Sequence, residues 1–311
     1  MRMTPIVGSR FRTDGGTMFG IVPRVIWRKA MPPDRSNRVA ESANCILIEL
    51  DDGRRGIVEA GCGDARDFDA RERRIHALGP GSPLMETLER MGLDAADIDF
   101  VVLSHLHWDH VGGVCSMVDG RPTLTFLNAM HYVHAVEWAA AGGGDPLLYK
   151  SYPQRPLTPL REHPDRVHFV EADDEEVLPG IRMVRSSGHT HGHCAVVLGE
   201  GELSANGASR AVRRAVFAGD NCPTQHHLRM VFQTAFDTHP LDTRAWKRRW
   251  LPEIAESGDL LLFCHDPDAF GAWIRPDPKK EFVVVEAVGS GEPGAGSGER
   301  GAGSEEPTWS D

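Results

Sequence analysis

Four potential metal ligands lie within six residues, directly after a short apolar segment. The segment DFVVL (residues 99–103) is typical of a buried strand, and SHLHWDHVGG follows it without a gap. This loop has the form HxHxDH and contains His105, His107, Asp109 and His110. Imidazole and carboxylate groups are the usual protein ligands of zinc and similar divalent ions. Alternate side chains of such a loop can turn toward one point and their neighbours toward a second, which indicates a metal site at a strand end.

Three further segments place the same residue types after apolar runs. SGHTHGH supplies His189, FAGD supplies Asp220, and FCHD supplies His265. With the first loop this gives seven candidate ligands, which is too many for one tetrahedral ion. The number fits two ions that share a bridging ligand and keep open positions for water or substrate.

The rest of the sequence predicts strands that alternate with helices, and therefore an α/β protein with its site at the strand ends. The turn DDG (51–53) between two β-rich runs predicts a hairpin. Residues 83–93 and 241–257 have helical spacing, and Gly258 ends the second helix. We expect one domain over residues 1–288. Residues 289–311 are rich in Gly, Ser and Glu and predict a disordered tail.

The composition indicates which kinds of partner and which cellular compartment to expect. No run of 18 apolar residues exists, and the N-terminal residues lack the apolar core of a signal peptide. The six cysteines are scattered without a CxxC pair, which argues against a disulfide framework. The net charge of −11 without a basic stripe argues against nucleic-acid binding. We expect a cytoplasmic protein that acts on a small molecule, without membrane association, and a homodimer is one option for its assembly.

The ordered set HxHxDH, GHTxGH, GD and HD resembles the signature of the metallo-β-lactamase superfamily of hydrolases, and the resemblance extends over residues 12–275. It implies an αββα sandwich of two mixed β-sheets flanked by helices, with the site along one edge. Residues 14–39 and 219–243 are similar to a narrower subgroup, which contains the YtnP-like quorum-quenching lactonases.

The resemblance also implies a role for each ligand. His105, His107 and His189 would hold the first ion, whereas Asp109, His110 and His265 would hold the second. Asp220 would bridge the two ions, which we expect to be zinc, with manganese, cobalt or iron as alternatives. The resemblance also implies two residues that support the ligands without binding an ion. His193 would steady the ligand loop by hydrogen bonding, and Glu59 would have a structural role at a position where most members have aspartate.

On this basis we expect a hydroxide between the ions to attack the carbonyl of a lactone, possibly an N-acyl homoserine lactone, or of a related ester or thioester. Asp109 and Asp220 are the expected catalytic carboxylates, with Asp109 carrying a proton. Known acyl-homoserine lactonases have a tyrosine shortly after the bridging aspartate, and residues 221–224 contain none. Either His226 or His227 could replace it, although a structural role is as plausible for both.

Residues near the motifs in sequence are candidates for the substrate pocket. Apolar residues of the two segments that resemble the subgroup are predicted to line the pocket entrance. The thiol of a cysteine two residues after the bridging aspartate is a further candidate. These candidates are Phe19, Trp27, Phe232 and Cys222. Trp108, between the ligands of the first loop, is expected to face away from the metals and pack under the loop.

Three other functions fit the same ligands. A phosphotriester or phosphodiester hydrolase would direct the same hydroxide at phosphorus. A metal-dependent oxidoreductase of this fold usually has glutamate in the first motif and an added flavin domain, so His107 and the chain length argue against it. A metal-binding protein without catalysis is the third alternative.

Overall fold

The computed structural model describes residues 1–143 and 151–289, and these residues build two mixed β-sheets that pack face to face. The first sheet has eight strands, in which β3, β4, β7 and β8 run parallel and the pairs β1–β2, β2–β3 and β12–β13 are antiparallel. In spatial order it contains β13 (Ala208–Val212), β12 (Gly201–Ala205), β1 (Arg2–Asp14), β2 (Arg38–Glu49), β3 (Arg55–Val58), β4 (Phe100–Val102), β7 (Met130–His134) and β8 (Val167–Val170).

The second sheet has seven strands and is also mixed, because β14 and β15 are parallel while their other neighbours are antiparallel. Its spatial order is β17 (Glu281–Gly289), β16 (Ala269–Asp277), β15 (Leu260–Leu262), β14 (Ala215–Phe217), β11 (Cys194–Leu198), β10 (Ile181–Arg185) and β9 (Asp174–Leu178). A separate hairpin consists of β5 (Cys115–Val118) and β6 (Arg121–Leu124).

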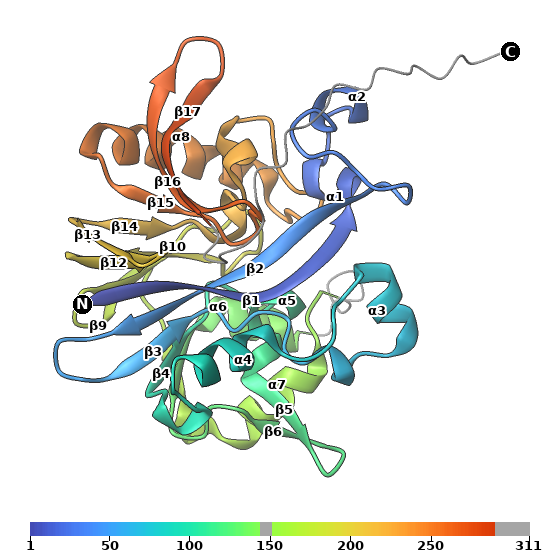
Figure 1. Ribbon diagram of the computed structural model, residues 1–311, viewed down its shortest axis with the longest axis vertical. Helices are drawn as coiled ribbons and strands as arrows, with labels where there is room; N and C mark the ends of the chain where they lie inside the picture. The colour runs from blue at the N-terminus through green and yellow to red at the C-terminus, as the bar shows by residue number, and fades with distance from the viewer. Residues whose placement is uncertain (144–150, 290–311) are drawn as a thin grey trace, which may run out of the picture.

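Helices cover the outer faces of the two sheets. Figure 1 shows α8 (Pro240–Ser257) on the outer side of the second sheet, whereas α4 (Pro83–Arg90) and α7 (Gln154–Glu162) lie on the opposite outer side, against the first. The remaining helices are α1 (Gly15–Phe19), α2 (Arg24–Trp27), α3 (Ala70–His76), α5 (Trp108–Val111) and α6 (Ala135–Gly142). This order of layers confirms the predicted sandwich of two mixed sheets flanked by helices.

The strand sequences explain the layers, because central strands bury both faces and successive side chains point to opposite sides. In β4, Phe100 and Val102 enter the core between the sheets, whereas Val101 packs outward against the helix layer. In β15, Leu260 and Leu262 enter the same inter-sheet core, whereas Leu261 packs outward toward α8. Short, wholly apolar strands therefore specify a core between the sheets and a further core under each helix layer.

Several predicted elements are confirmed. β2 and β3 form the hairpin around the turn at residues 51–53, and α8 ends at Gly258, which adopts the left-handed conformation with φ 66°. α4 begins at Pro83 and ends at Arg90, three residues earlier than the predicted segment. The predicted tail lies outside the described residues except for Gly289, the last residue of β17.

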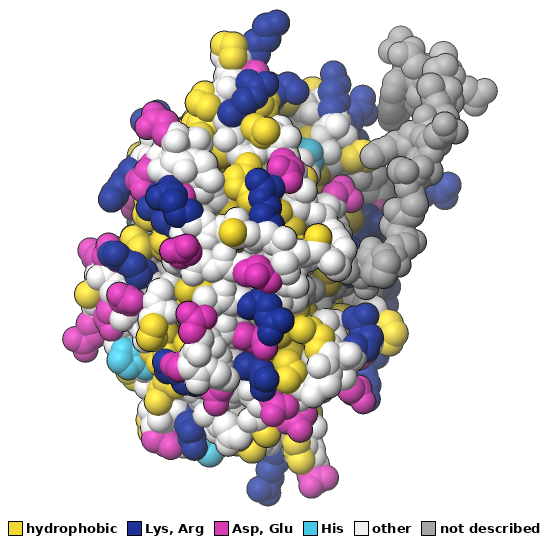
Figure 2. All heavy atoms as spheres, turned by 60° about the vertical axis from the view of Figure 1, so that its left-hand side comes forward, with side chains coloured by type: hydrophobic (Ala, Val, Ile, Leu, Met, Phe, Trp, Pro, Cys, Tyr) yellow, Lys and Arg dark blue, Asp and Glu magenta, His cyan; other side chains and the backbone are white. Residues whose placement is uncertain are grey.

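The surface mixes charges of both signs. Figure 2 shows Lys and Arg side chains interspersed with Asp and Glu side chains over one face, without a continuous stripe of either sign. Within residues 1–143 and 151–289, no helix has the length and apolar character needed to cross a membrane.

Candidate metal centre

The four ligand-bearing loops meet at one edge of the sandwich, at the carboxyl ends of β4, β10, β14 and β15. The first loop crosses from β4 to α5, and its backbone is fastened to the second sheet because Cys194 N donates to Ser104 O at 2.9 Å. Gly112 and Gly113 follow α5, and a Cβ on either would collide with the backbone of residues 60–62. These two glycines thus allow the loop to pack closely against the turn after β3.

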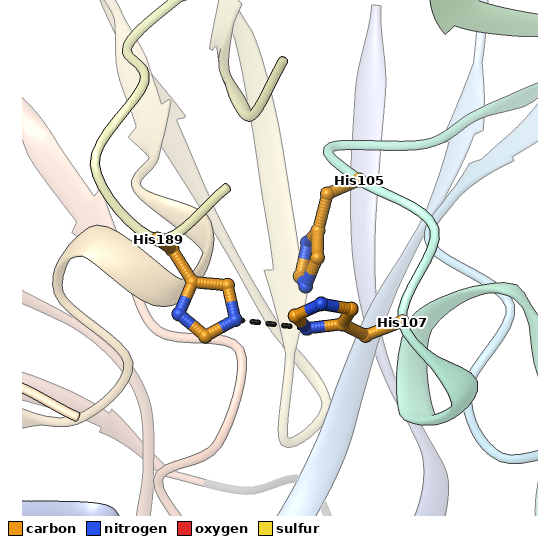
Figure 3. A group of neighbouring side chains, drawn as sticks. All are labelled: His105, His107 and His189. Atoms are coloured by element: carbon orange, nitrogen blue, oxygen red, sulfur yellow. Dashed lines mark hydrogen bonds between the residues drawn. The ribbon is translucent and has the colours of Figure 1, made fainter. Parts of the chain in front are cut away.

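Three histidines converge on one point, as Figure 3 shows for His105, His107 and His189. One potential ligand atom from each lies within 4.8 Å of the others, and His189 Nε2 is 2.9 Å from His107 Nδ1. His105 is fully buried, and its Nε2 has no hydrogen-bond partner among the described residues. A buried nitrogen without a partner is unfavourable unless something binds it, so this group fits a cation.

A second group lies beside the first and combines Asp109, His110 and His265. The Nε2 atoms of His110 and His265 are 3.1 Å apart, and His265 Nε2 is 3.4 Å from Asp109 Oδ2. Two imidazoles with their Nε2 atoms at this distance do not form a favourable contact unless a proton or a cation lies between them. This group therefore also has the chemistry of a divalent-metal site.

Asp220 lies between the two groups, in the single turn η5 (Gly219–Asn221) that follows β14. Its Oδ1 is 3.1 Å from His265 Nε2 and 3.3 Å from His110 Nε2. Its Oδ2 is 3.1 Å from His189 Nε2, on the side of the first group. One oxygen thus faces each group, which is the arrangement expected of a carboxylate that bridges two ions.

Acceptors on the outer side orient the ligand imidazoles. Three Nδ1 atoms contact oxygens at 3.0–3.1 Å, so each of these rings turns its Nε2 inward. The three pairs are His110 with Glu59, His189 with Asp237, and His265 with the carbonyl of Ser42. Such partners fix the ring orientation before a cation binds, which favours tight binding.

The two residues expected outside the ligand set lie where they can support it. His193 Nε2 accepts the backbone N–H of Asp220 at 3.1 Å, and its Nδ1 is 2.7 Å from Ser186 Oγ. Burial lowers the pKa of His193 to about 3, so the ring is neutral and can accept. Glu59 accepts from Ser104 N at 2.8 Å while it contacts His110, and it does so from a left-handed conformation with φ 65°.

The charged groups of the centre shift one another's pKa values. Burial lowers the pKa of His110, but the carboxylates of Asp220, Asp109 and Glu59 outweigh burial and raise it to about 10. Burial lowers the pKa of His105 well below its usual value, and the neighbouring His110 and His107 lower it further. An imidazole binds a cation through a deprotonated nitrogen, so cation binding at His110 would displace a proton.

Sequence reasoning missed a buried carboxylate that joins the ligand loops. Glu137, in α6, is fully buried, and it accepts from Leu106 N at 3.0 Å and from Thr190 Oγ1 at 2.6 Å. Tyr152 also hydrogen-bonds to it, and the Tyr152 ring lies 5.1 Å from the His107 ring. An acidic residue in the otherwise apolar sequence AVEWAAAG was the available signal, but its partners are distant in the sequence.

Two further residues near the ligands were also missed. Asp237 accepts from Thr234 Oγ1 and Thr243 Oγ1 in addition to orienting His189. Cys264 donates its thiol proton to Asp220 Oδ1 at 3.1 Å, so it contacts the candidate bridge.

A cavity of about 70 Å³ opens over the two groups. Trp108 lines it, and its ring contacts those of Phe11 at 5.3 Å and His76 at 4.5 Å. The expectation that Trp108 faces away was therefore wrong, because α5 starts at this residue and turns its ring toward β1 and α3. The full lining is Thr13, Thr17, Met18, Glu41, His76, His107, Trp108, Asp109, Ser151, His189, Asp220, Thr234, Phe236 and His265.

None of the predicted pocket residues lines this cavity. Phe19, Trp27 and Phe232 form a separate buried cluster, in which Phe19 stacks on Trp27 at 5.4 Å and on His227 at 5.2 Å. Their apolar rings gain more from contact with one another than from exposure at a cavity mouth. The prediction that these three residues line the substrate pocket is therefore corrected to packing in a buried cluster.

The other pocket candidates are corrected for similar reasons. His227 is fully buried, with its Nδ1 2.8 Å from Thr224 Oγ1 and its Nε2 donating to Met18 O at 3.0 Å, so neither nitrogen can reach a substrate. Cys222 is buried in the core beneath α8. His226 is half-buried and does not line the cavity, and the charges that act on its pKa are those of Asp266 and Asp268.

Comparison with known proteins identifies the family. The model of the metallo-β-lactamase superfamily matches residues 38–205, which is more than half of the chain. The chain belongs to the metallo-β-lactamase superfamily. A probable metal-dependent hydrolase from Staphylococcus aureus has a similar solved structure, with a TM-score of 0.74, 25% identity, and coverage of 92% of this chain and 97% of that one.

Other similar proteins match a shorter stretch of this chain or have a lower identity. An N-acyl homoserine lactonase of a Bacillus species is 27% identical over 115 residues, and a probable metallo-hydrolase of Mycobacterium tuberculosis is 28% identical over 174. These stretches are 37% and 52% of this chain, but only 38% and 54% of the two relatives. AidC, a dizinc quorum-quenching lactonase solved with a product, shares the fold with a TM-score of 0.67, 16% identity, and coverage of 90% and 92%.

Proposed function

We propose that this protein is a hydrolase that holds two divalent cations, zinc first, and opens a lactone or cleaves a related ester or thioester. The observation that carries the proposal is the position of Asp220, with one carboxylate oxygen toward each of two histidine groups. A single-ion site would not need a carboxylate that faces both ways. Distant relatives described as N-acyl homoserine lactonases and as a dizinc lactonase support the choice of substrate class.

His105, His107 and His189 would hold the first cation, and Asp109, His110 and His265 the second. When bound, two such cations lower the pKa of water and polarise a carbonyl group. The chain itself keeps the ligands rigid through the outer oxygens that hold the imidazoles. Ligands of this kind suit zinc, and manganese, cobalt and iron remain alternatives for the same donors.

Asp109 is the candidate for proton transfer. Its side chain lines the cavity and is 13% exposed, whereas its Oδ2 is 3.4 Å from His265 Nε2. It can therefore accept a proton on the cavity side and deliver it to the leaving oxygen of a bound substrate. Tyr152 is not available for this task because its hydroxyl bonds to buried Glu137 and Thr190.

A substrate panel tests the proposal. Metal-loaded protein, chelated protein and the variant Asp220→Asn would be assayed against γ-lactones, N-acyl homoserine lactones, aryl esters, thioesters and phosphotriesters. We expect lactone hydrolysis that chelation abolishes and that Asp220→Asn reduces by several orders of magnitude. Cleavage of phosphotriesters alone would contradict the proposed substrate class. Two bound ions without any hydrolysis would favour a non-catalytic metal-binding protein.

A further inference from the structure

A groove of about 550 Å³ runs along β1, and none of the candidate metal ligands lines it. The chain from Ala77 to Arg90, which includes α4, supplies much of the rest of its wall. The apolar part of the lining consists of half-buried side chains, namely Pro5, Val7, Leu78, Pro83 and Pro267. Binding pockets have volumes of about 300–1,000 Å³ and mostly apolar walls with a few polar groups. This cavity, the β1 groove, therefore has the size and the lining of a binding site.

Arginines dominate the charge of the β1 groove. Arg10, Arg12 and Arg90 line it, together with the carboxyl groups of Glu41 and Glu86. Glu86 is exposed, but Glu41 is only 4% exposed and so contributes little to the accessible surface. Arg90 donates to uncharged oxygens of its own helix, at 3.3 and 2.8 Å, and forms no ion pair among the described residues. An anionic group is therefore the complementary occupant.

The chain itself supplies an acidic segment that begins beside this groove. β17 ends at Gly289, which pairs with Ala269 on β16. Pro267, two residues before Ala269, lines the groove. Successive Cα atoms are 3.8 Å apart and paired Cα atoms up to about 5.5 Å, so the Cα atoms of Gly289 and Pro267 lie within about 13 Å of each other. Residues 290–311 are long enough to span this distance several times.

The composition of residues 290–311 complements the β1 groove. The segment contains five acidic residues and one arginine, and Trp309 is its only aromatic residue. The sequence EEPTWSD, which starts at Glu305, places two carboxylates close to this tryptophan. Carboxylates pair with guanidinium groups, and a tryptophan ring packs on apolar side chains and on guanidinium planes. The groove offers both kinds of partner.

The β1 groove and the metal cavity share a wall. Phe11 lines the groove, and its ring lies 5.3 Å from the ring of Trp108 and 5.6 Å from that of His265. Trp108 and His265 line the metal cavity, and Glu41 lines both spaces. A ligand in the groove therefore packs against the same residues that shape the metal cavity.

We propose that residues 290–311 bind in the β1 groove of the same chain, with Glu305 and Glu306 at the arginines and Trp309 against the apolar wall. Attachment at Gly289 favours this occupant over a free one, because tethering through a short linker raises the effective concentration to the order of millimolar. A millimolar intrinsic affinity therefore fills the groove in about half of the molecules. The interaction is separate from the hydrolysis proposed above, so neither proposal depends on the other.

Photo-crosslinking of the full chain tests the proposal. The photoreactive residue p-benzoylphenylalanine would replace Trp309, and mass spectrometry would locate the crosslinks after irradiation. We expect crosslinks to residues 5–12 and 77–90, which line the groove. A mixture of isotope-labelled and unlabelled protein separates crosslinks within one chain from crosslinks between two copies. Crosslinks confined to other surfaces, or formed only between copies, would overturn the proposal.

Charge variants test the chemistry of the contact. Arg90→Glu should lower the yield of groove crosslinks about threefold to tenfold, because an attraction becomes a repulsion, and added salt should also lower it. Combining Arg90→Glu with Glu305→Arg and Glu306→Arg should restore part of the yield. The matched control is Arg121→Glu, at an exposed position outside the groove. An unchanged yield in Arg90→Glu, or an equal loss in the control, would overturn the proposed pairing.

Hydrogen exchange gives a second measurement, without the crosslinker. The amides of residues 77–83, beside the groove, should exchange about twofold faster in Trp309→Ala than in the wild type, because a contact that covers them is lost. The amides of β8 should exchange at the same rate in both proteins, since this strand does not line the groove. Equal exchange at residues 77–83 in both proteins would overturn the proposal. Circular dichroism of every variant would show that it is folded.

Discussion

Replacing Glu137 by alanine should weaken both the fold and the metal centre, because this one carboxylate joins three parts of the site. It bonds to Leu106, between two ligands of the first loop, to Thr190, next to His189, and to Tyr152. Glu137→Ala would leave these donors unpaired in a region without access to water. The small residue would also leave a cavity at the start of α6.

The size of the effect follows from the hydrogen bonds. Bonds to a charged acceptor contribute roughly 1.5–3 kcal/mol each, and two of them here have lengths of 3.0 and 2.6 Å. Burial raises the pKa of Glu137, so burying the carboxylate has a cost that alanine removes. We therefore expect a net loss of about 3–5 kcal/mol for Glu137→Ala and about 1–2 kcal/mol for Glu137→Gln.

Denaturant unfolding of the chelated protein would give the stability change, and competition with a chromophoric chelator would give the metal affinity. We expect the affinity for the more weakly held ion to fall about tenfold to a hundredfold. Exposed Glu162, at the end of α7, offers the control Glu162→Ala, which should change neither quantity. An unchanged stability would refute the reasoning, and a stability loss with unchanged metal affinity would limit Glu137 to a role in the fold.

Three other changes test separate parts of the account. Asp237→Asn removes the carboxylate that orients His189. Metal competition assays should report a loss of metal affinity of about tenfold to a hundredfold. An unchanged metal affinity would argue against this role. Metal loading should release protons and strengthen as pH rises, because the carboxylates around His110 raise its pKa to about 10 despite burial; calorimetry in buffers of different ionisation enthalpy counts those protons. Burial lowers the pKa of His131 to about 4, so the unfolded chain takes up a proton at a higher pH than the folded protein does. The free energy of unfolding should therefore be unaffected by this group above pH 6.5 and should fall by about 3 kcal/mol as the pH drops toward 4. His131→Gln should flatten the stability of the chelated protein over that range, and an unchanged pH dependence would contradict the assignment.

The grouping of the candidate ligands at one edge could be predicted, because most of them follow a strong local signal. Apolar strands end at Val102, Phe217 and Leu262, and a histidine or aspartate follows each within three residues. Strands of this kind end at one edge of a sandwich, so residues after them meet. The alternation of strands and helices predicted only an α/β protein, whereas the two sheets and the outer helices were expected from the resemblance to the metallo-β-lactamase superfamily.

The cavity wall could not be predicted in this way. Phe19 and Phe232 are near the motifs in sequence, but an apolar ring beside a site packs into a core as readily as it lines a pocket. His76 and Glu41 reach the cavity from α3 and β2, through contacts that depend on how these elements pack against β1. Their place in the cavity wall depends on tertiary geometry, which no local pattern encodes.

The number of metal ions per chain tests the central claim most directly. Mass spectrometry of the native protein, with elemental analysis of the same sample, would count the ions in the wild type and in Asp220→Ala. We predict two divalent ions per chain in the wild type and the loss of at least one in the variant, because Asp220 places one oxygen toward each group. A wild type that holds one ion under saturating metal, or a variant that still holds two, would contradict the bridged pair.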